Sequence, residues 1–187
     1  MKKTALMVLI LASACLAHAG EIRNLLANPD FRSGMEHWEL EGKTGTATPK
    51  DGALELNVQK TRNSGLFKLQ QALRNLKVGE TYRLSFTASC EKPQTRPVVI
   101  SYRMRRKPKN LGFIKWIPLH QGEQKVFVEI IPGLESDSPD DPPVLSFYLG
   151  ELDGKVTLSE VTLYNLGDIQ PVKPPFSAKW TVFALMD

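Results

Sequence analysis

Apolar residues in this chain recur at every second position, in short runs that end at Gly, Pro, Asn or Asp. The clearest run covers residues 81–89, where Tyr82, Leu84, Phe86 and Ala88 alternate with polar side chains. This period is typical of a β-strand, in which successive side chains point to opposite faces of a sheet. Strands are predicted by this pattern at residues 24–26, 37–41, 53–58, 65–71, 81–89, 97–104, 113–117, 125–131, 144–149 and 155–164, the last with an irregularity at Ser159-Glu160.

About ten short strands with almost no helix signal limit the fold class strongly. A single sheet of that size could not cover its own apolar face, so the strands must form two packed sheets. The chain is therefore predicted to be an all-β, two-sheet β-sandwich.

The ends of the chain differ in character from its middle. Lys2 and Lys3 precede an apolar run that closes with Ala17-His18-Ala19, so residues 1–19 are predicted to be a signal peptide. Residues 20–166 are assigned to the sandwich, and residues 167–187 to a Pro-rich linker with a short apolar tail. The mature protein is expected to be secreted, or to lie in the periplasm or cell envelope, without a membrane span.

An alternative for the N-terminus is a lipoprotein signal. The segment Ala12-Ser13-Ala14-Cys15 resembles a lipobox, in which Cys15 would carry a lipid anchor, although Ala12 stands where Leu is usual. Under either alternative Cys90 is left without an intramolecular disulfide partner, and it is predicted to be a small buried residue at a strand end.

Charge and residue inventory exclude several function classes. The formal charge of +4 falls to +2 without Lys2 and Lys3, which does not indicate nucleic-acid binding. After the leader only His37 and His120 remain as histidines, in separate segments, and no Ser or Cys has the context of a catalytic nucleophile. The protein is therefore predicted not to be an enzyme.

Several motifs in order resemble a known family. They are residues 24–34 (NLLANPDFRSG) followed by Trp38, then 69–71 (LQQ), 78–88 (VGETYRLSFTA), 147–150 (FYLG) and 156–163 (VTLSEVTL). Together they resemble carbohydrate-binding modules of the CenC-like superfamily, families four, nine and twenty-two. The resemblance spans about residues 22–166 and implies a jelly roll of the galactose-binding-domain type. It also implies a non-catalytic module that binds a polysaccharide or glycan, with Trp38 in the core.

The same resemblance raises the question of a structural calcium ion. Family members often bind it through the acidic residue after the first Phe and an Asp in the last strand, whereas this chain has Arg32 and Glu160 at those positions. A cation at one ligand position argues against the site, so no cofactor is assigned with certainty. A set of oxygen ligands from Asn28, Asp30 and Glu160 remains the candidate.

Sugar binding requires rings that stack on a pyranose and polar groups that satisfy its hydroxyls. The resemblance places the groove across the concave sheet, where outward-facing residues of the strands would line it. The predicted carbohydrate-binding residues are Gln70, Arg83, Ser85, Arg103 and Tyr148, with Trp116 as an aromatic at the rim. The alternatives are that Tyr148 only caps a sheet edge and that Trp116 belongs to the core.

Two charged runs are interpreted first as solvated loops. They are residues 103–109 (RMRRKPK) and 135–141 (ESDSPDD). The basic run could instead favour an acidic glycan, because the guanidinium of Arg can donate two parallel hydrogen bonds to a carboxylate.

Two other functions remain open. One is an adhesive envelope sandwich without a sugar groove that assembles through Trp180 and Phe183, and the other is a binding domain appended to a truncated glycoside hydrolase. A single exposed groove lined by Tyr148, Trp116 and Arg83 would favour glycan binding over adhesion.

Overall fold

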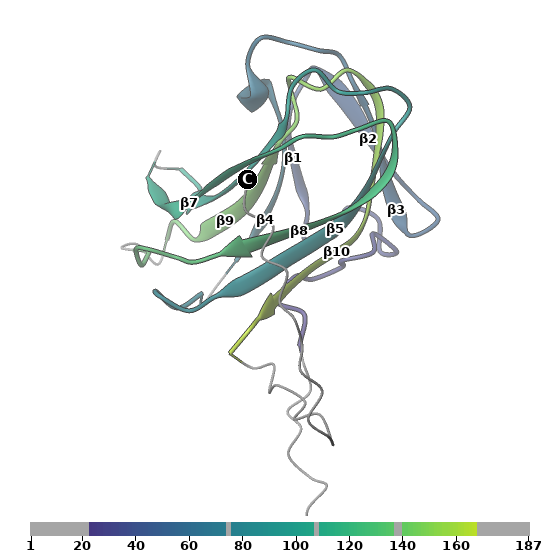
Figure 1. Cartoon of the computed structure of the whole chain (residues 1–187). Helices are drawn as coiled ribbons and strands as arrows, with labels where there is room; N and C mark the ends of the chain where they lie inside the picture. The colour runs from purple at the N-terminus through teal and green to yellow at the C-terminus, as the bar shows by residue number, and fades with distance from the viewer. Residues whose placement is uncertain (1–22, 74–75, 107–108, 137–139, 168–187) are drawn as a thin grey trace, which may run out of the picture.

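The computed structural model describes residues 23–73, 76–106, 109–136 and 140–167. In these residues ten strands form two antiparallel sheets of five strands each (Figure 1). Sheet A contains, in spatial order, β1 (Glu39–Gly42), β4 (Phe67–Ala72), β9 (Pro143–Tyr148), β6 (Val98–Met104) and β7 (Asn110–Ile117). Sheet B contains β2 (Gly45–Lys50), β3 (Ala53–Val58), β10 (Gly154–Asn165), β5 (Tyr82–Cys90) and β8 (Gly122–Ile130). The predicted two-sheet jelly-roll sandwich is confirmed.

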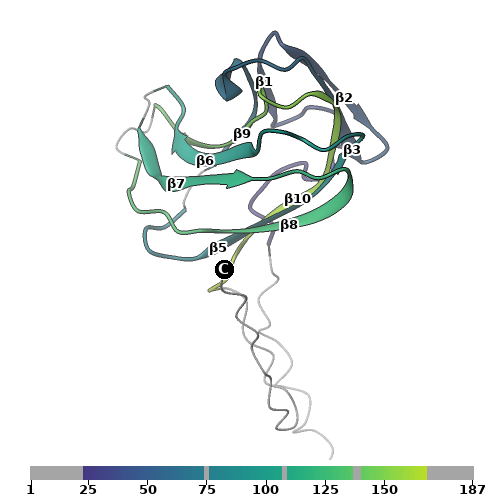
Figure 2. The same ribbon diagram turned by 45° about the horizontal axis from the view of Figure 1, so that its top comes forward.

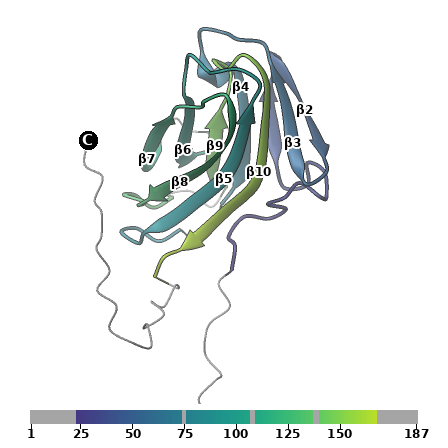
Figure 3. The same ribbon diagram turned by 45° about the vertical axis from the view of Figure 1, so that its right-hand side comes forward.

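The two sheets pack face to face. In Figure 2, strands β6, β7 and β9 lie above β5, β8 and β10, and Figure 3 shows β4, β6, β7 and β9 as the layer behind β5, β8 and β10. No helix in the described ranges is long and apolar enough to cross a membrane. The predicted signal peptide, Cys15 and nearly all of the predicted tail lie outside the described residues.

A chain of aromatic rings joins the two sheets in the core. Phe147 of sheet A packs against Phe86 of sheet B, with ring centroids 5.4 Å apart, and against Trp38 at 6.3 Å. Trp38 in turn contacts Phe31 at 5.3 Å, and its indole N–H donates to the carbonyl of Asn28. These rings are buried, which confirms the prediction for Trp38. Cys90 is also buried at the end of β5, as predicted.

Two strand predictions were wrong. Residues 24–26 do not form a strand, because Asn24 Oδ1 accepts hydrogen bonds from the N–H groups of Leu26 and Leu163 and turns the chain locally. Strand β2 was missed because its outer position leaves little apolar alternation, and it tolerates Pro49 since one side of an edge strand needs no donor. The irregularity predicted in the last strand is confirmed as a register shift between Ser159 and Thr162, where Glu160 has a φ of 52°.

Tyr102, on the inner side of β6, makes stability depend on alkaline pH. Burial raises the pKa of its phenol to about 12, and the nearby Tyr82 adds to the rise. The same phenol ionises at about pH 10 in an unfolded chain. Its contribution to stability is therefore complete below about pH 10 and is lost as the pH rises toward the folded pKa.

We expect the free energy of unfolding to fall between roughly pH 10 and 12, by about 2–3 kcal/mol from this group. Denaturant unfolding at a series of pH values should show a weaker fall for Tyr102→Phe. The same pH dependence in both proteins would show that the phenol does not contribute.

Candidate functional site

The outer face of sheet A carries a groove of about 280 Å³. Its lining includes Val99, Ser101, Arg103, Ile114, Trp116 and Tyr148, all from the adjacent strands β9, β6 and β7. Strand pairing places outward side chains in rows that cross the sheet. One row is Glu41, Lys68, Tyr148, Val99 and Trp116, and the next is Glu39, Gln70, Ser146, Ser101 and Ile114.

Two aromatic side chains flank Val99 in the first row. Trp116 is 63% exposed on β7, and Tyr148 is half-buried on β9. The two backbones are two strands apart, about 10 Å at the usual spacing. Arg103 Nη1 donates to the Tyr148 hydroxyl at 2.7 Å, and Lys68 Nζ lies 6.0 Å from the Tyr148 ring centroid. The tyrosine is thus held in place while the tryptophan stands open to solvent.

Two serine hydroxyls lie beside these rings without partners. Ser101 and Ser146 are register partners on β6 and β9, and they are 3% and 1% exposed. Among the described residues, neither Oγ has a hydrogen-bond partner. A buried hydroxyl left unpaired costs about 1–3 kcal/mol, and native proteins contain few such groups. These two hydroxyls therefore lower the stability of the sandwich beneath this face.

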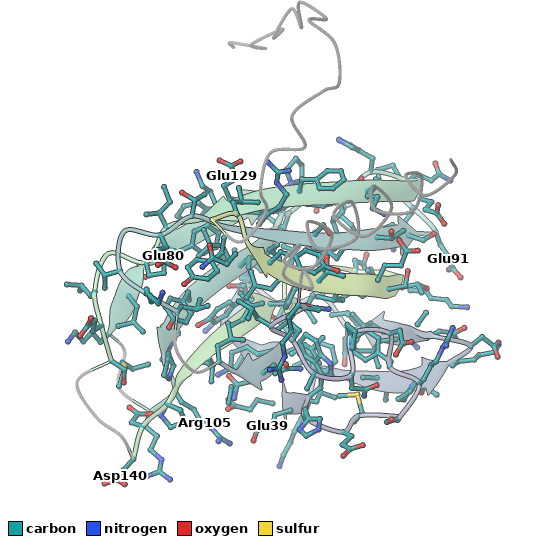
Figure 4. All side chains as sticks on the ribbon, turned by 90° about the horizontal axis from the view of Figure 1, so that it is seen from below. Glu39, Glu80, Glu91, Arg105, Glu129 and Asp140 are labelled. Atoms are coloured by element: carbon teal, nitrogen blue, oxygen red, sulfur yellow. The ribbon has the colours of Figure 1, made fainter. Side chains whose placement is uncertain are left out.

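Charges at the β1 side of the face are paired. Arg105 Nη2 donates to both carboxylate oxygens of Glu39, at 2.5 and 2.6 Å, and Lys68 Nζ lies 2.5 Å from Glu41 Oε2. The Gln70 amide nitrogen donates to Glu41 at 2.6 Å and to Glu39 at 3.3 Å. The hydrogen bond from Lys68 holds the pKa of Glu41 below its usual value. Figure 4 shows Glu39 and Arg105 side by side, on the other side of the molecule from Glu129.

The six predicted carbohydrate-binding residues do not lie at one place. Gln70, Arg103, Trp116 and Tyr148 share the outer face of sheet A. Arg83 and Ser85 lie on β5 of sheet B, on the opposite side of the sandwich.

The contacts of these two residues are also different from those expected. Arg83 pairs with Glu129 at 3.1 Å, and the Ser85 hydroxyl lies 2.7 Å from that of Thr162. Grouping them with the other four was an error, because alternation tells which face of a strand is outward but not which sheet the strand joins.

Several residues of this face were missed in the sequence. They are Lys68, Val99, Ser101, Ile114 and Ser146, with Glu39 and Glu41 at the β1 side. The available signal was a serine within otherwise apolar strands, in VVISYRM and PVLSFY. Each serine looks ordinary in its own strand, and only the pairing of β9 with β6 brings the two together.

The three candidate calcium ligands are engaged elsewhere. The Asn28 amide nitrogen donates to the carbonyls of Gly34 and Glu36, and so organises its own loop. Asp30 pairs with Arg32 at 3.0 Å, and Glu160 pairs with Lys125 at 3.1 Å, which lowers the pKa of Glu160. In the described part of the chain no group of three or more His, Cys, Asp or Glu residues could hold a metal. These contacts give no support to calcium binding by the three residues. The calcium site therefore stays a prediction from the sequence.

The charged runs are only partly solvated loops. Arg103 and Met104 belong to β6, while Arg105 and Arg106 are exposed after it. Asp141 is buried, at 4% exposed, and its carboxylate accepts a hydrogen bond from the N–H of Arg106. The prediction that residues 135–141 are all solvated was therefore wrong for Asp141. Residues 107–108 and 137–139 lie outside the described residues.

Comparison with solved structures places the fold among carbohydrate-binding modules. The second N-terminal cellulose-binding domain of Cellulomonas fimi β-1,4-glucanase C has 22% identity and a TM-score of 0.65, covering 77% of this chain and 95% of that one. A CBM4 structure has 18% identity and a TM-score of 0.58, covering 73% and 91%. The N-terminal cellulose-binding domain of the same glucanase has 18% identity and a TM-score of 0.52, covering 74% and 93%.

The sequence gives a more direct assignment than these distant structures. No curated protein sequence matches the chain. A family model described as "Carbohydrate binding domain" matches residues 23–140, which is more than half of the chain and includes most strands of both sheets. The chain therefore belongs to this family, which combines carbohydrate-binding modules of families four and nine.

Proposed function

We propose that the groove on sheet A is where this module binds a polysaccharide or glycan. The observation that carries the proposal is one groove lined by two aromatic side chains, Trp116 and Tyr148, with the polar side chains of Arg103 and Asn110 beside them. A pyranose presents apolar C–H faces that stack on Trp116 and Tyr148, and its hydroxyls both donate and accept hydrogen bonds. One sugar chain can therefore contact both the rings and the polar side chains of the groove.

The adhesive alternative receives less support. Trp116 and Tyr148 share one groove, as glycan binding requires, whereas Arg83 is on the other sheet. The groove expected from all three residues is thus formed by two of them. We further propose that the module works outside the cytoplasm and has no reaction of its own, as the leader-like residues 1–19 and the residue inventory indicate.

Replacing Trp116 with alanine tests the groove directly. We expect glycan affinity to fall roughly tenfold, because one aromatic stacking contact contributes about 0.5–1.5 kcal/mol beyond burial. A glycan that binds would first be identified on an array of neutral and acidic polymers. Its affinity would then be measured by isothermal titration calorimetry.

The matched control is Phe127→Ala. Phe127 is 62% exposed, nearly as much as Trp116, but it lies on β8 of sheet B. Its removal is expected to leave affinity unchanged. Equal losses in the two variants, or an array without any bound glycan, would refute the assignment of the groove.

A further inference from the structure

Arg103 places a cation in the groove without a neighbouring carboxylate. It is half-buried on β6 and lines the groove with Trp116 and Tyr148. Across the described ranges it forms no ion pair, whereas Arg83 pairs with Glu129 and Arg105 pairs with Glu39. The charge of this guanidinium is therefore uncompensated at the place where a ligand would lie.

The contacts of Arg103 hold the guanidinium in one orientation. Its Nε donates to the carbonyl of Met104 at 3.1 Å, and its Nη1 donates to the Tyr148 hydroxyl at 2.7 Å. An arginine has five N–H donors, so both hydrogens of Nη2 and one of Nη1 remain for a ligand. A guanidinium fixed in this way loses little further freedom when it binds a planar anion.

Other groups around Arg103 also favour an acceptor-rich ligand. Asn110 is its register partner on β7, and the side-chain oxygen Oδ1 of Asn110 already accepts hydrogen bonds from the N–H groups of Gly112 and Phe113, both at 3.0 Å. The Asn110 amide N–H groups are therefore what this side chain can still offer.

The acidic residues of the same face do not offset this preference. Glu39 and Glu41 lie on β1, three strands from β6 in the order of sheet A. Each is already neutralised by a cation, Glu39 by Arg105 and Glu41 by Lys68. Around Arg103 the groove thus combines several hydrogen-bond donors with one unmatched positive charge.

We propose that this groove selects an acidic glycan, one whose sugars carry carboxylates, and that Arg103 binds the carboxylate of the sugar placed between Trp116 and Tyr148. The proposal rests on the function proposed above and specifies its ligand class. A carboxylate is preferred to a sulfate because its two coplanar oxygens match the fork of adjacent guanidinium N–H groups.

The test compares uronic acid oligosaccharides with their carboxyl-reduced counterparts, which keep the same backbone without the charge. The probes are oligogalacturonate, oligomannuronate and glucuronoxylan oligosaccharides, measured by isothermal titration calorimetry. We expect at least one acidic probe to bind tenfold or more tightly than its reduced form. Arg103→Gln should remove this preference, and Arg103→Lys should keep only part of it because an ammonium ion lacks the fork.

The matched control is Arg83→Gln, which removes an arginine from the opposite sheet and should leave the preference unchanged. Equal binding of acidic and reduced probes, or an unchanged preference in a folded Arg103→Gln protein, would overturn this inference but not the proposed glycan binding. A sulfated glycan without carboxylates that binds as tightly as the uronate probe would overturn the carboxylate assignment. If no glycan of either kind binds, the proposed function fails together with the inference.

Discussion

Phe147→Ala is expected to lower the free energy of unfolding by about 3–5 kcal/mol, the usual cost of removing a buried aromatic ring. Phe147 is fully buried on β9, and its ring contacts Phe86 of the opposite sheet and Trp38. The variant would leave a cavity where the two sheets meet, because neighbouring rings can relax only partly into the space.

Equilibrium unfolding in guanidinium chloride, followed by far-ultraviolet circular dichroism, measures this loss. The control is again Phe127→Ala, since that ring is mostly exposed and its removal should change stability by roughly 0.5 kcal/mol or less. A loss below about 1 kcal/mol for Phe147→Ala would mean that the aromatic chain does not hold the sheets together.

The double variant Trp116→Ala/Tyr148→Ala is expected to weaken glycan binding by about 100-fold or more. Each ring contributes about 0.5–1.5 kcal/mol by stacking, and loss of Tyr148 also frees the guanidinium of Arg103 that donates to its hydroxyl. The combined effect should exceed that of Trp116→Ala alone, since both rings are proposed to contact the same sugar chain.

Affinity would be measured by isothermal titration calorimetry with the glycan that gives the strongest array signal. A matched double control is Phe127→Ala/Tyr164→Ala, which removes two aromatic residues from strands β8 and β10 of sheet B. If the groove variant bound within threefold of the unmodified protein, while still folded, the rings could not be the binding platform.

The sequence predicted the strands better than it predicted the site. Alternation alone identified β5 and β9, because each places apolar residues at every second position facing the core. It missed β2, where only Ala47 packs partly against the core and the strand is defined by its pairing with β3.

The site depended on information that no single strand contains. Arg83 and Arg103 both look like outward residues of regular strands, yet β5 and β6 belong to different sheets. Sheet membership follows from the order of strands in space, so local periodicity cannot separate these two arginines. Tyr148 was predicted in the same way, as an outward residue of its strand, and Trp116 as an aromatic at the rim of the groove that the family resemblance implies.

The unpartnered hydroxyls of Ser101 and Ser146 lower stability on the face of sheet A that carries the proposed groove. An alanine at either position would not bury an unpaired oxygen, so variants selected only for survival at high temperature should tend to lose these serines. The resulting proteins would resist heat better, and the rings and the arginine of the proposed groove would stay in place. These two adjacent positions on β6 and β9 are therefore where the sandwich can be stabilised without changing the proposed sugar contacts.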